Sequence, residues 1–297
     1  MDNLIRIASI LVVVLATGML VVSAVALYAA RRLIYPPRSR PTTTMTVDRH
    51  DFEAVSFLTR DGLTLRGWFV PAPRPKGAVV LCHGYAGDCS PDFIYAPLLR
   101  DAGYNILFFD FRGHGASDGH NTSLVYLERV DLLAALDFLK SRGIPRVALL
   151  GFSMGGAIVL ATAPASPMVA GVISDCAFAE LRQVIQVAAA ARGFPDLLCP
   201  LIGWLAVVFA SVQLRANLFS SDPIRWIGKI APRPVLIMHA GADREVPAAQ
   251  AQQLFDAADE PKELWIAPNA GHRRIEEVAP NEYRKRVLDF LDRVFAG

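Results

Sequence analysis

The sequence predicts an α/β fold in which a mainly parallel sheet of eight strands is covered by helices on both faces. From about residue 50 onward, short apolar runs of strand length alternate with longer runs of helical length, which is the pattern of a parallel sheet with crossover helices. One strand-like run leads directly into Gly-Phe-Ser-Met-Gly at 151–155 and then into a helix-forming run of small and apolar residues. The length of 297 residues suffices for one large α/β domain or two small ones.

Each element of this sheet has its own signal in the chain. Arg60-Asp61-Gly62 lies between two strand-like runs, and Asp-Gly in that position predicts a hairpin. The helix at 123–142 is indicated by leucines and alanines that recur on one face. The predicted strands are 52–59, 63–70, 77–83, 104–110, 146–151, 169–175, 233–239 and 262–267, and further helices are expected at 91–102, after Ser153 and after each of the last two strands.

The alternation of strands stops between 178 and 230. This segment is strongly apolar and helical in pattern, and its most apolar run, 201–209, is too short to cross a membrane. About 50 residues is longer than an ordinary loop. We therefore expect a helical cap insertion at 178–230, in which the run 201–209 is either a buried helix or part of a lid.

An uncharged run of 24 residues occupies positions 7–30. At about 1.5 Å per residue it would form about 36 Å of helix, enough to span a bilayer with some tilt. A cleaved secretory signal is the alternative, because Ala-Val-Ala at 24–26 resembles a cleavage site. Its apolar region would be too long, however, and only Arg6 is basic before it. We expect a transmembrane anchor with its basic flank at 1–35, in contact with the lipid bilayer through residues 7–30.

The charges beside this run predict its orientation. The N-terminal side carries only Asp2 and Arg6, whereas the C-terminal side carries four positive charges, Arg31, Arg32, Arg38 and Arg40. Excess positive charge marks the cytoplasmic side of a span. A single-pass protein with its catalytic domain in the cytoplasm is therefore expected, with an exported or signal-cleaved protein as the alternative. Residues 36–49, rich in Pro and Thr, are the expected linker to the domain at 50–297.

Charge and cysteine content exclude some functions. The chain has 30 Lys and Arg against 28 Asp and Glu, and because residues 1–49 hold six Arg and two Asp, residues 50–297 carry a net charge of −2. A nearly neutral body does not indicate nucleic-acid binding. The four cysteines show no C-x-x-C spacing, and the six histidines are scattered, so neither a metal site nor a disulfide framework is expected.

The G-x-S-x-G stretch carries the chemistry. Its context predicts a nucleophile elbow, a strained turn that pushes the Ser153 hydroxyl out of the sheet, rather than an ordinary tight turn. Gly151 and Gly155 would leave room for neighbouring backbone to approach closely. The first helical N–H groups, beginning with Met154, would point at an oxygen that becomes negative near this serine.

Four more motifs accompany the elbow, in this order: His-Gly-Tyr at 83–85, Asp-Phe-Arg-Gly-His-Gly-Ala-Ser-Asp-Gly at 110–119, Gly-Ala-Asp-Arg-Glu-Val-Pro at 241–247 and Asn-Ala-Gly-His at 269–272. With them, residues 50–297 resemble the α/β-hydrolase superfamily, and most of all its monoacylglycerol-lipase and serine-aminopeptidase-like branch. The resemblance implies an α/β-hydrolase fold with a cap and does not specify a substrate.

The order Ser153, Asp243, His272 is the catalytic order of that fold. A serine hydroxyl needs a base such as His272 to take its proton, and the histidine needs a carboxylate to hold its tautomer. Asp243 follows an apolar strand, at the edge of a parallel sheet where such sites lie. Asp175, at the end of the strand 169–175, is the rival acid that some branches use. The expected oxyanion hole is formed by the backbone N–H groups of Tyr85 and Met154.

These residues imply a membrane-anchored serine hydrolase that cleaves small-molecule carboxylic esters through an acyl-enzyme, with no cofactor. The apolar cap favours substrates with a medium or long hydrocarbon chain. The same residues also suit a serine peptidase or amidase. A non-catalytic scaffold is a further alternative, although such proteins usually lack a member of the triad, and this sequence lacks none.

Overall fold

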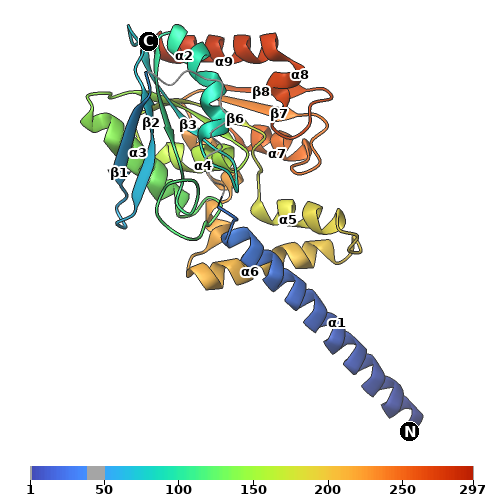
Figure 1. Cartoon of the computed structure of the whole chain (residues 1–297). Helices are drawn as coiled ribbons and strands as arrows, with labels where there is room; N and C mark the ends of the chain where they lie inside the picture. Colours follow the sequence, from blue (N-terminus) through green and yellow to red (C-terminus); the bar gives the residue numbers. More distant parts are fainter. Residues whose placement is uncertain (1, 39–50, 297) are drawn as a thin grey trace.

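The computed structural model describes residues 2–38 and 51–296, and it contains the expected eight-stranded sheet (Figure 1). The strands lie in the order β1-β2-β4-β3-β5-β6-β7-β8. Every neighbouring pair from β4 to β8 is parallel, while β1 and β2 form an antiparallel hairpin and β2 pairs antiparallel to β4. The strands are β1 (Glu53–Leu58), β2 (Thr64–Val70), β3 (Gly77–Cys82), β4 (Tyr104–Phe109), β5 (Val147–Phe152), β6 (Val169–Asp175), β7 (Val235–Ala240) and β8 (Lys262–Ala267).

The sheet is covered on both faces, as the sequence predicts. Successive residues of a strand point to opposite faces, and in β3 Val79 and Leu81 belong to one buried cluster while Val80 and Cys82 belong to the other. Beyond the N-terminal helix, the helices are α2 (Ala96–Asp101), α3 (Glu128–Ser141), α4 (Met154–Thr162), α5 (Leu181–Ala190), α6 (Cys199–Leu214), α7 (Ala249–Ala257), α8 (Ile275–Val278) and α9 (Pro280–Phe295). The cluster with Val79 and Leu81 includes side chains of α2 and α9, and the cluster with Val80 and Cys82 includes side chains of α3, α4 and α7.

One helix starts later than its sequence pattern suggests. Expected at 123–142, α3 begins at Glu128. The buried Glu128 carboxylate accepts hydrogen bonds from the Thr122 hydroxyl and from the backbone N–H and hydroxyl of Ser123. These bonds hold the preceding residues in a turn, in which Leu124 has a φ of 64°. Side-chain bonds to nearby backbone often compete with helix in this way.

Residues 178–230 contain helices and no strand. Two antiparallel helices, α5 and α6, extend from the carboxyl end of β6 and lie beside the N-terminal helix (Figure 1). Their close approach depends on Gly203, where a Cβ would lie 2.7 Å from the Arg182 carbonyl oxygen. Three short 3-10 turns then return the chain to β7.

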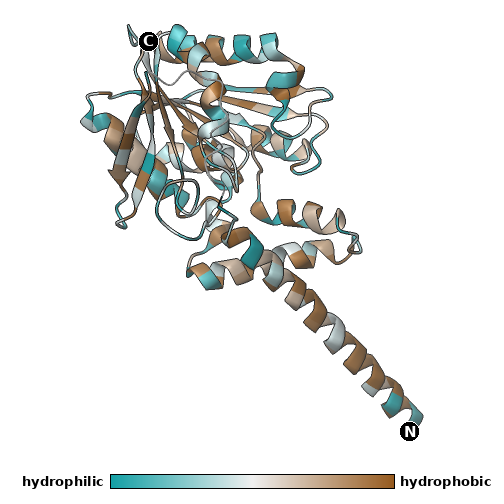
Figure 2. Ribbon diagram, in the orientation of Figure 1, coloured by the Kyte–Doolittle hydropathy of each residue, from teal (hydrophilic) through white to brown (hydrophobic). Residues whose placement is uncertain are grey.

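The N-terminal helix α1 (Asp2–Ile34) projects far from the body (Figure 1). Its apolar surface continues along the projecting part (Figure 2). Among the described residues, the stretch Asn3–Ile34 is long and apolar enough to cross a membrane, a test that N-terminal secretion signals also pass. Only its last turns are covered, with Val22, Ala26 and Ala30 buried on one side. Residues 39–49 of the expected linker, and Arg40 with them, lie outside the described residues.

Candidate active site

Ser153 occupies a sharp turn between β5 and α4. Its φ of 52° and ψ of −113° lie in a region that side chains rarely adopt. The turn is possible because its neighbours are glycines. A Cβ on Gly151 would lie 2.3 Å from the Gly155 carbonyl oxygen, and a Cβ on Gly155 would lie 1.9 Å from the Cys82 carbonyl oxygen. Either substitution would force backbone apart, so both glycines are needed for the turn.

Three side chains from distant parts of the chain form a hydrogen-bonded row beside this turn. His272 Nε2 lies 2.9 Å from the Ser153 hydroxyl oxygen, and His272 Nδ1 lies 2.6 Å from Asp243 Oδ2. The residues follow the carboxyl ends of β5, β7 and β8, which meet at one edge of a parallel sheet. Both distances are within hydrogen-bond range, and the first is short enough for transfer of a proton from the serine to the histidine.

The Asp243 carboxylate is fixed by the backbone as well as by His272. Its Oδ1 accepts hydrogen bonds of 2.9 Å from the N–H groups of both Glu245 and Val246. Burial alone would raise the pKa of Asp243, but the hydrogen bonds from His272 and from these N–H groups outweigh burial and hold the pKa below its ordinary value. Asp243 therefore stays ionised and can orient the imidazole.

Asp175, the rival acid, lies beside the elbow but faces another partner. Its backbone oxygen accepts a hydrogen bond from the Ser153 N–H, and its Oδ2 accepts one from the Tyr283 hydroxyl. In the described part of the chain its carboxylate makes no hydrogen bond with His272. Burial raises the pKa of Asp175, whereas a carboxylate that supports an imidazolium must be ionised. The geometry favours Asp243.

The two expected oxyanion donors also come close to Ser153. Met154 is the first residue of α4, so its N–H has no partner within the helix. Tyr85 follows Gly84, where a Cβ would lie 3.6 Å from Ser153 Cβ. Over residues 2–38 and 51–296, neither N–H donates a hydrogen bond to the protein. Both are therefore free for an oxygen of a bound substrate.

Comparison with known proteins identifies the family. The model of the alpha/beta hydrolase family matches residues 79–289, which is more than half of the chain. The chain belongs to the alpha/beta hydrolase family. A relative from Bacillus subtilis (strain 168), the uncharacterized protein YqkD, is 30% identical over 237 residues, which cover 78% of this hydrolase and 76% of YqkD.

Solved structures agree with this assignment. The Pyrococcus furiosus esterase Pf2001 is 25% identical, with a TM-score of 0.70, and the alignment covers 88% of this hydrolase and 98% of the esterase. The Paleococcus ferrophilus monoacylglycerol lipase aligns with a TM-score of 0.57 at 20% identity, over 77% of this hydrolase and 99% of the lipase. The second likeness concerns the fold alone. Together these findings identify the chain as an enzyme of the hydrolase type.

Buried polar residues hold the loops of this hydrolase around the elbow. The Phe111 N–H donates to His83 Nε2, and His83 Nδ1 donates to the Gly84 carbonyl, so His83 joins two loops. The Arg112 guanidinium forms ion pairs with the carboxylates of Asp61 and Asp131. Arg112 thus ties its loop to the β1–β2 hairpin and to α3.

Sequence reasoning missed Arg273, the residue after His272. It adopts a φ of 57°, and its guanidinium forms an ion pair with the buried carboxylate of Asp92 and lies 4.6 Å from the centre of the Phe152 ring. This pair fixes the loop that carries His272 against the residues before α2. A lone arginine that follows a histidine has no sequence pattern that would reveal such a distant partner.

One group of atoms near the site has the spacing of metal ligands. The Cys176 sulfur and ligand atoms of Asp243 and His272 all lie within 4.8 Å of one another. Metal binding requires a thiolate and free ligand atoms. Burial raises the pKa of the Cys176 thiol, and Asp243 and His272 already bond each other. The donor set therefore favours the hydrogen-bonded row rather than a metal site.

Proposed function

We propose that this hydrolase is a serine esterase that cleaves small-molecule carboxylic esters through an acyl-enzyme. The observation that carries the proposal is the continuous row Ser153–His272–Asp243, with 2.9 Å and 2.6 Å between its atoms. The strained elbow supports it, because such strain is found mostly at functional sites. The lowered pKa of Asp243 supports it as well, because an ionised carboxylate can hold and stabilise the His272 imidazolium.

In the first half-reaction, the Ser153 oxygen bonds to the ester carbonyl carbon while its proton passes to His272 Nε2. The negative oxygen of the tetrahedral intermediate accepts hydrogen bonds from the N–H groups of Tyr85 and Met154. The bond to the alcohol oxygen then breaks, and this oxygen takes the proton from His272. Asp243 stabilises the imidazolium while it carries the proton.

In the second half-reaction, a water molecule gives a proton to His272 Nε2 as its oxygen bonds to the acyl carbon. Collapse of this second intermediate releases the carboxylic acid and returns the proton to Ser153. No cofactor takes part in either half. The same steps would hydrolyse an amide, and the likeness to an esterase of 25% identity favours esters.

Labelling by a fluorophosphonate tests the nucleophile. The wild-type protein should be labelled, Ser153→Ala should not, and the exposed-serine control Ser141→Ala should be labelled like wild type. Loss of a triad residue removes several powers of ten in rate. Labelling that persists in Ser153→Ala, or a folded wild-type protein that is never labelled, would leave the proposal without its nucleophile.

The substrate class needs a second assay, with p-nitrophenyl esters beside aminoacyl amides of matched size. A serine peptidase measured in parallel gives the ester-to-amide ratio of kcat/KM that follows from the easier chemistry of esters. An esterase should show a higher ratio than this peptidase. Hydrolysis of the amides with equal or higher kcat/KM would establish the peptidase alternative.

We further propose that α1 crosses a membrane, with the hydrolase domain on the cytoplasmic side. Arg31 and Arg32 lie in the last turn of α1, and Arg38 donates hydrogen bonds to the carbonyl groups of Ser117 and Gly119. These positive charges are held beside the hydrolase domain, on the side that the distribution of positive charge assigns to the cytoplasm.

A further inference from the structure

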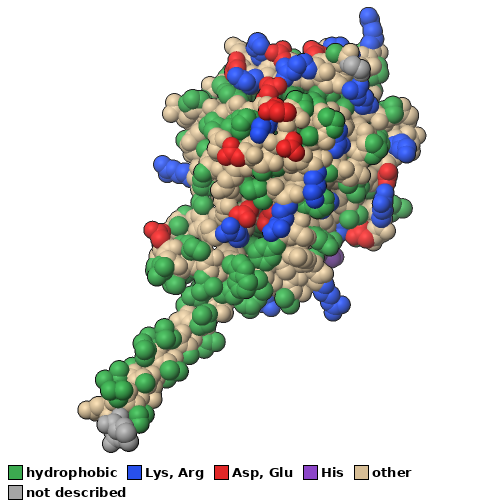
Figure 3. All heavy atoms as spheres, turned by 180° about the vertical axis from the view of Figure 1, so that it is seen from behind, with side chains coloured by type: hydrophobic (Ala, Val, Ile, Leu, Met, Phe, Trp, Pro, Cys, Tyr) green, Lys and Arg blue, Asp and Glu red, His purple; other side chains and the backbone are tan. Residues whose placement is uncertain are grey.

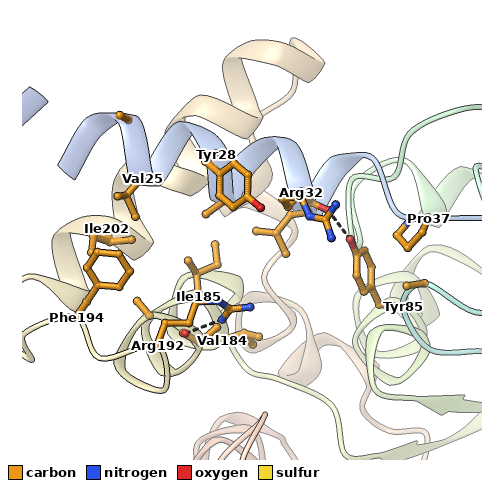
Figure 4. A pocket seen from close by; sticks show the side chains of 16 residues that line it. Val25, Tyr28, Arg32, Pro37, Tyr85, Val184, Ile185, Arg192, Phe194 and Ile202 are labelled. Carbon is orange, nitrogen blue, oxygen red and sulfur yellow. Dashed lines mark hydrogen bonds between the residues drawn. The ribbon is translucent and has the colours of Figure 1, made fainter. Parts of the chain in front are cut away.

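A cavity of about 770 Å³ lies between the N-terminal helix and the cap helices, a size within the range of small-molecule sites. Side chains from α1, α5, α6 and the loop after β3 line it (Figure 4). Most are apolar. Val25 and Tyr28 come from α1, Val184 and Ile185 from α5, Ile202 from α6 and Tyr85 from the loop. The N-terminal helix α1 thus forms one wall of the pocket.

The structure fixes this wall to the hydrolase domain at the end of α1. The last carbonyl groups of a helix lack partners within it. Here the Tyr85 hydroxyl donates to the Arg32 carbonyl at 2.7 Å, and the Thr122 N–H donates to the Ile34 carbonyl at 2.9 Å. Val22 packs with Ile202 of α6 in a small buried cluster. These contacts, apolar on one side and polar at the end, hold α1 at a defined position beside the cap.

The cavity adjoins the loop after β3, which carries Tyr85 with its proposed oxyanion-binding N–H. Tyr85 and Ala86 are lining residues, while Ser153 itself is not. Gly84, next in the chain, approaches Ser153 closely enough that a Cβ would lie 3.6 Å from Ser153 Cβ. An ester carbonyl held at Ser153 would therefore have its chain directed past this loop toward α1 and α5.

The other end of α1 is exposed along its whole circumference. Residues 3–21 are all exposed, and at about 1.5 Å per residue they measure about 28 Å, close to the hydrocarbon thickness of a bilayer. With this part in the membrane, the cavity lies at the membrane surface. Apolar side chains gather where α1 meets the body (Figure 3), and Leu197 and Trp204 of the cap region are exposed.

We propose that this cavity binds the hydrocarbon chain of an ester amphiphile that enters from the bilayer along α1. The helix then has two roles, as a membrane span and as a wall of the acyl-chain site. The inference rests on the proposed function, since it assigns a substrate class to the same serine. An apolar chain already in the bilayer reaches the pocket without crossing water, and the lining then replaces its lipid neighbours.

A bulky side chain introduced on α1 tests whether this helix forms a wall of the acyl-chain site. Ala24 lines the cavity, while Ala16 is exposed on the projecting part of the same helix. In full-length protein, Ala24→Trp should lower the ratio of kcat/KM for p-nitrophenyl decanoate to that for the acetate by at least about tenfold, an effect that a single methylene can have in an apolar pocket. The matched control Ala16→Trp should keep the wild-type ratio.

The opposite wall gives an independent pair. Ala188 of α5 lines the cavity, and Ala190 of the same helix is exposed and does not. Ala188→Trp should lower the ratio as Ala24→Trp does, and Ala190→Trp should not. An enzyme that hydrolyses the acetate and labels at Ser153, but whose ratio is unchanged in both lining variants, would overturn the pocket assignment alone. Absence of labelling and hydrolysis in wild type would overturn the proposed function and this inference with it.

The route from the bilayer has its own measurement. In one arrangement, full-length protein is reconstituted into phosphatidylcholine vesicles that contain a long-chain monoacyl ester. In the other, the vesicles that hold the protein lack the ester, and separate vesicles contain the same total amount of it. Faster initial hydrolysis of ester in the protein's own bilayer, with a rate that follows its surface fraction, is expected. Equal rates in the two arrangements would show entry from water and overturn the route.

Discussion

Replacement of Asp243 by Asn tests the electrostatics of the site with little change in shape. The two backbone N–H groups that bond Oδ1 at 2.9 Å remain in the variant. They require an acceptor, so the amide oxygen of Asn takes that position and its NH₂ group faces His272. An NH₂ group donates, and the neutral imidazole must then accept at Nδ1 and carry its proton on Nε2. This is the atom 2.9 Å from the Ser153 oxygen.

In that tautomer His272 cannot accept the serine proton, and its charged form loses its carboxylate partner. A substitution of this kind lowers kcat by about 10⁴, equivalent to about 5.4 kcal/mol of transition-state stabilisation. KM should change little, because Asp243 contacts His272 rather than the substrate. The assay is hydrolysis of a short p-nitrophenyl ester at saturating concentration, with thermal unfolding measured to confirm that the variant is folded.

Asp175→Asn is the matched control. The Asn oxygen can still accept the hydrogen bond from the Tyr283 hydroxyl, which spans 3.0 Å in the structure. Activity should therefore stay within about tenfold of wild type, since no hydrogen bond to His272 is lost. A folded Asp175→Asn variant that loses more activity than Asp243→Asn would refute the assignment of the acid.

Three further predictions concern the elbow, a buried ion pair and topology. Gly155→Ala places a methyl group 1.9 Å from the Cys82 carbonyl oxygen, so we expect about 1–3 kcal/mol less stability and a strong loss of fluorophosphonate labelling; unchanged labelling and melting would contradict the steric argument. Burial raises the pKa of Asp131 to about 6 despite its hydrogen bonds from Arg112. Arg112→Met should lower the free energy of unfolding by about 3–5 kcal/mol at pH 8. The loss should be smaller at pH 5, because below its raised pKa the Asp131 carboxyl is protonated and leaves no unpaired buried charge. The stability that this protonated carboxyl gives is lost as pH rises through the pKa. Denaturant unfolding that shows a larger loss at pH 5 than at pH 8 would reject this argument. Protease added to intact cells or spheroplasts should leave the hydrolase domain whole until lysis; digestion before lysis, or a mature chain beginning near Leu27, would indicate an inverted anchor or a cleaved signal.

Much of the fold was predictable because its signals are local. The inner parallel strands β3, β4, β5, β6 and β7 are buried along almost their whole length, so each appears as a largely apolar run. The outer strands β1, β2 and β8 mix exposed with buried residues, and all eight observed strands overlap the expected ranges. The elbow was predictable for a similar reason, since only glycine fits at positions 151 and 155. Boundaries set by side chains were not, as Glu128 shows by delaying α3 through bonds to Thr122 and Ser123.

The sequence by itself determined the order of Ser153, Asp243 and His272 and the apolar character of residues 7–30. Tertiary structure decided which carboxylate faces His272, because Asp175 ends one apolar strand and Asp243 follows another, and only their neighbours in space show which one meets the imidazole. It also decided that α1 packs against the cap and lines a cavity. A helix that is apolar on every side has no periodicity to distinguish a face that meets protein from one that meets lipid, so only the folded chain separates them.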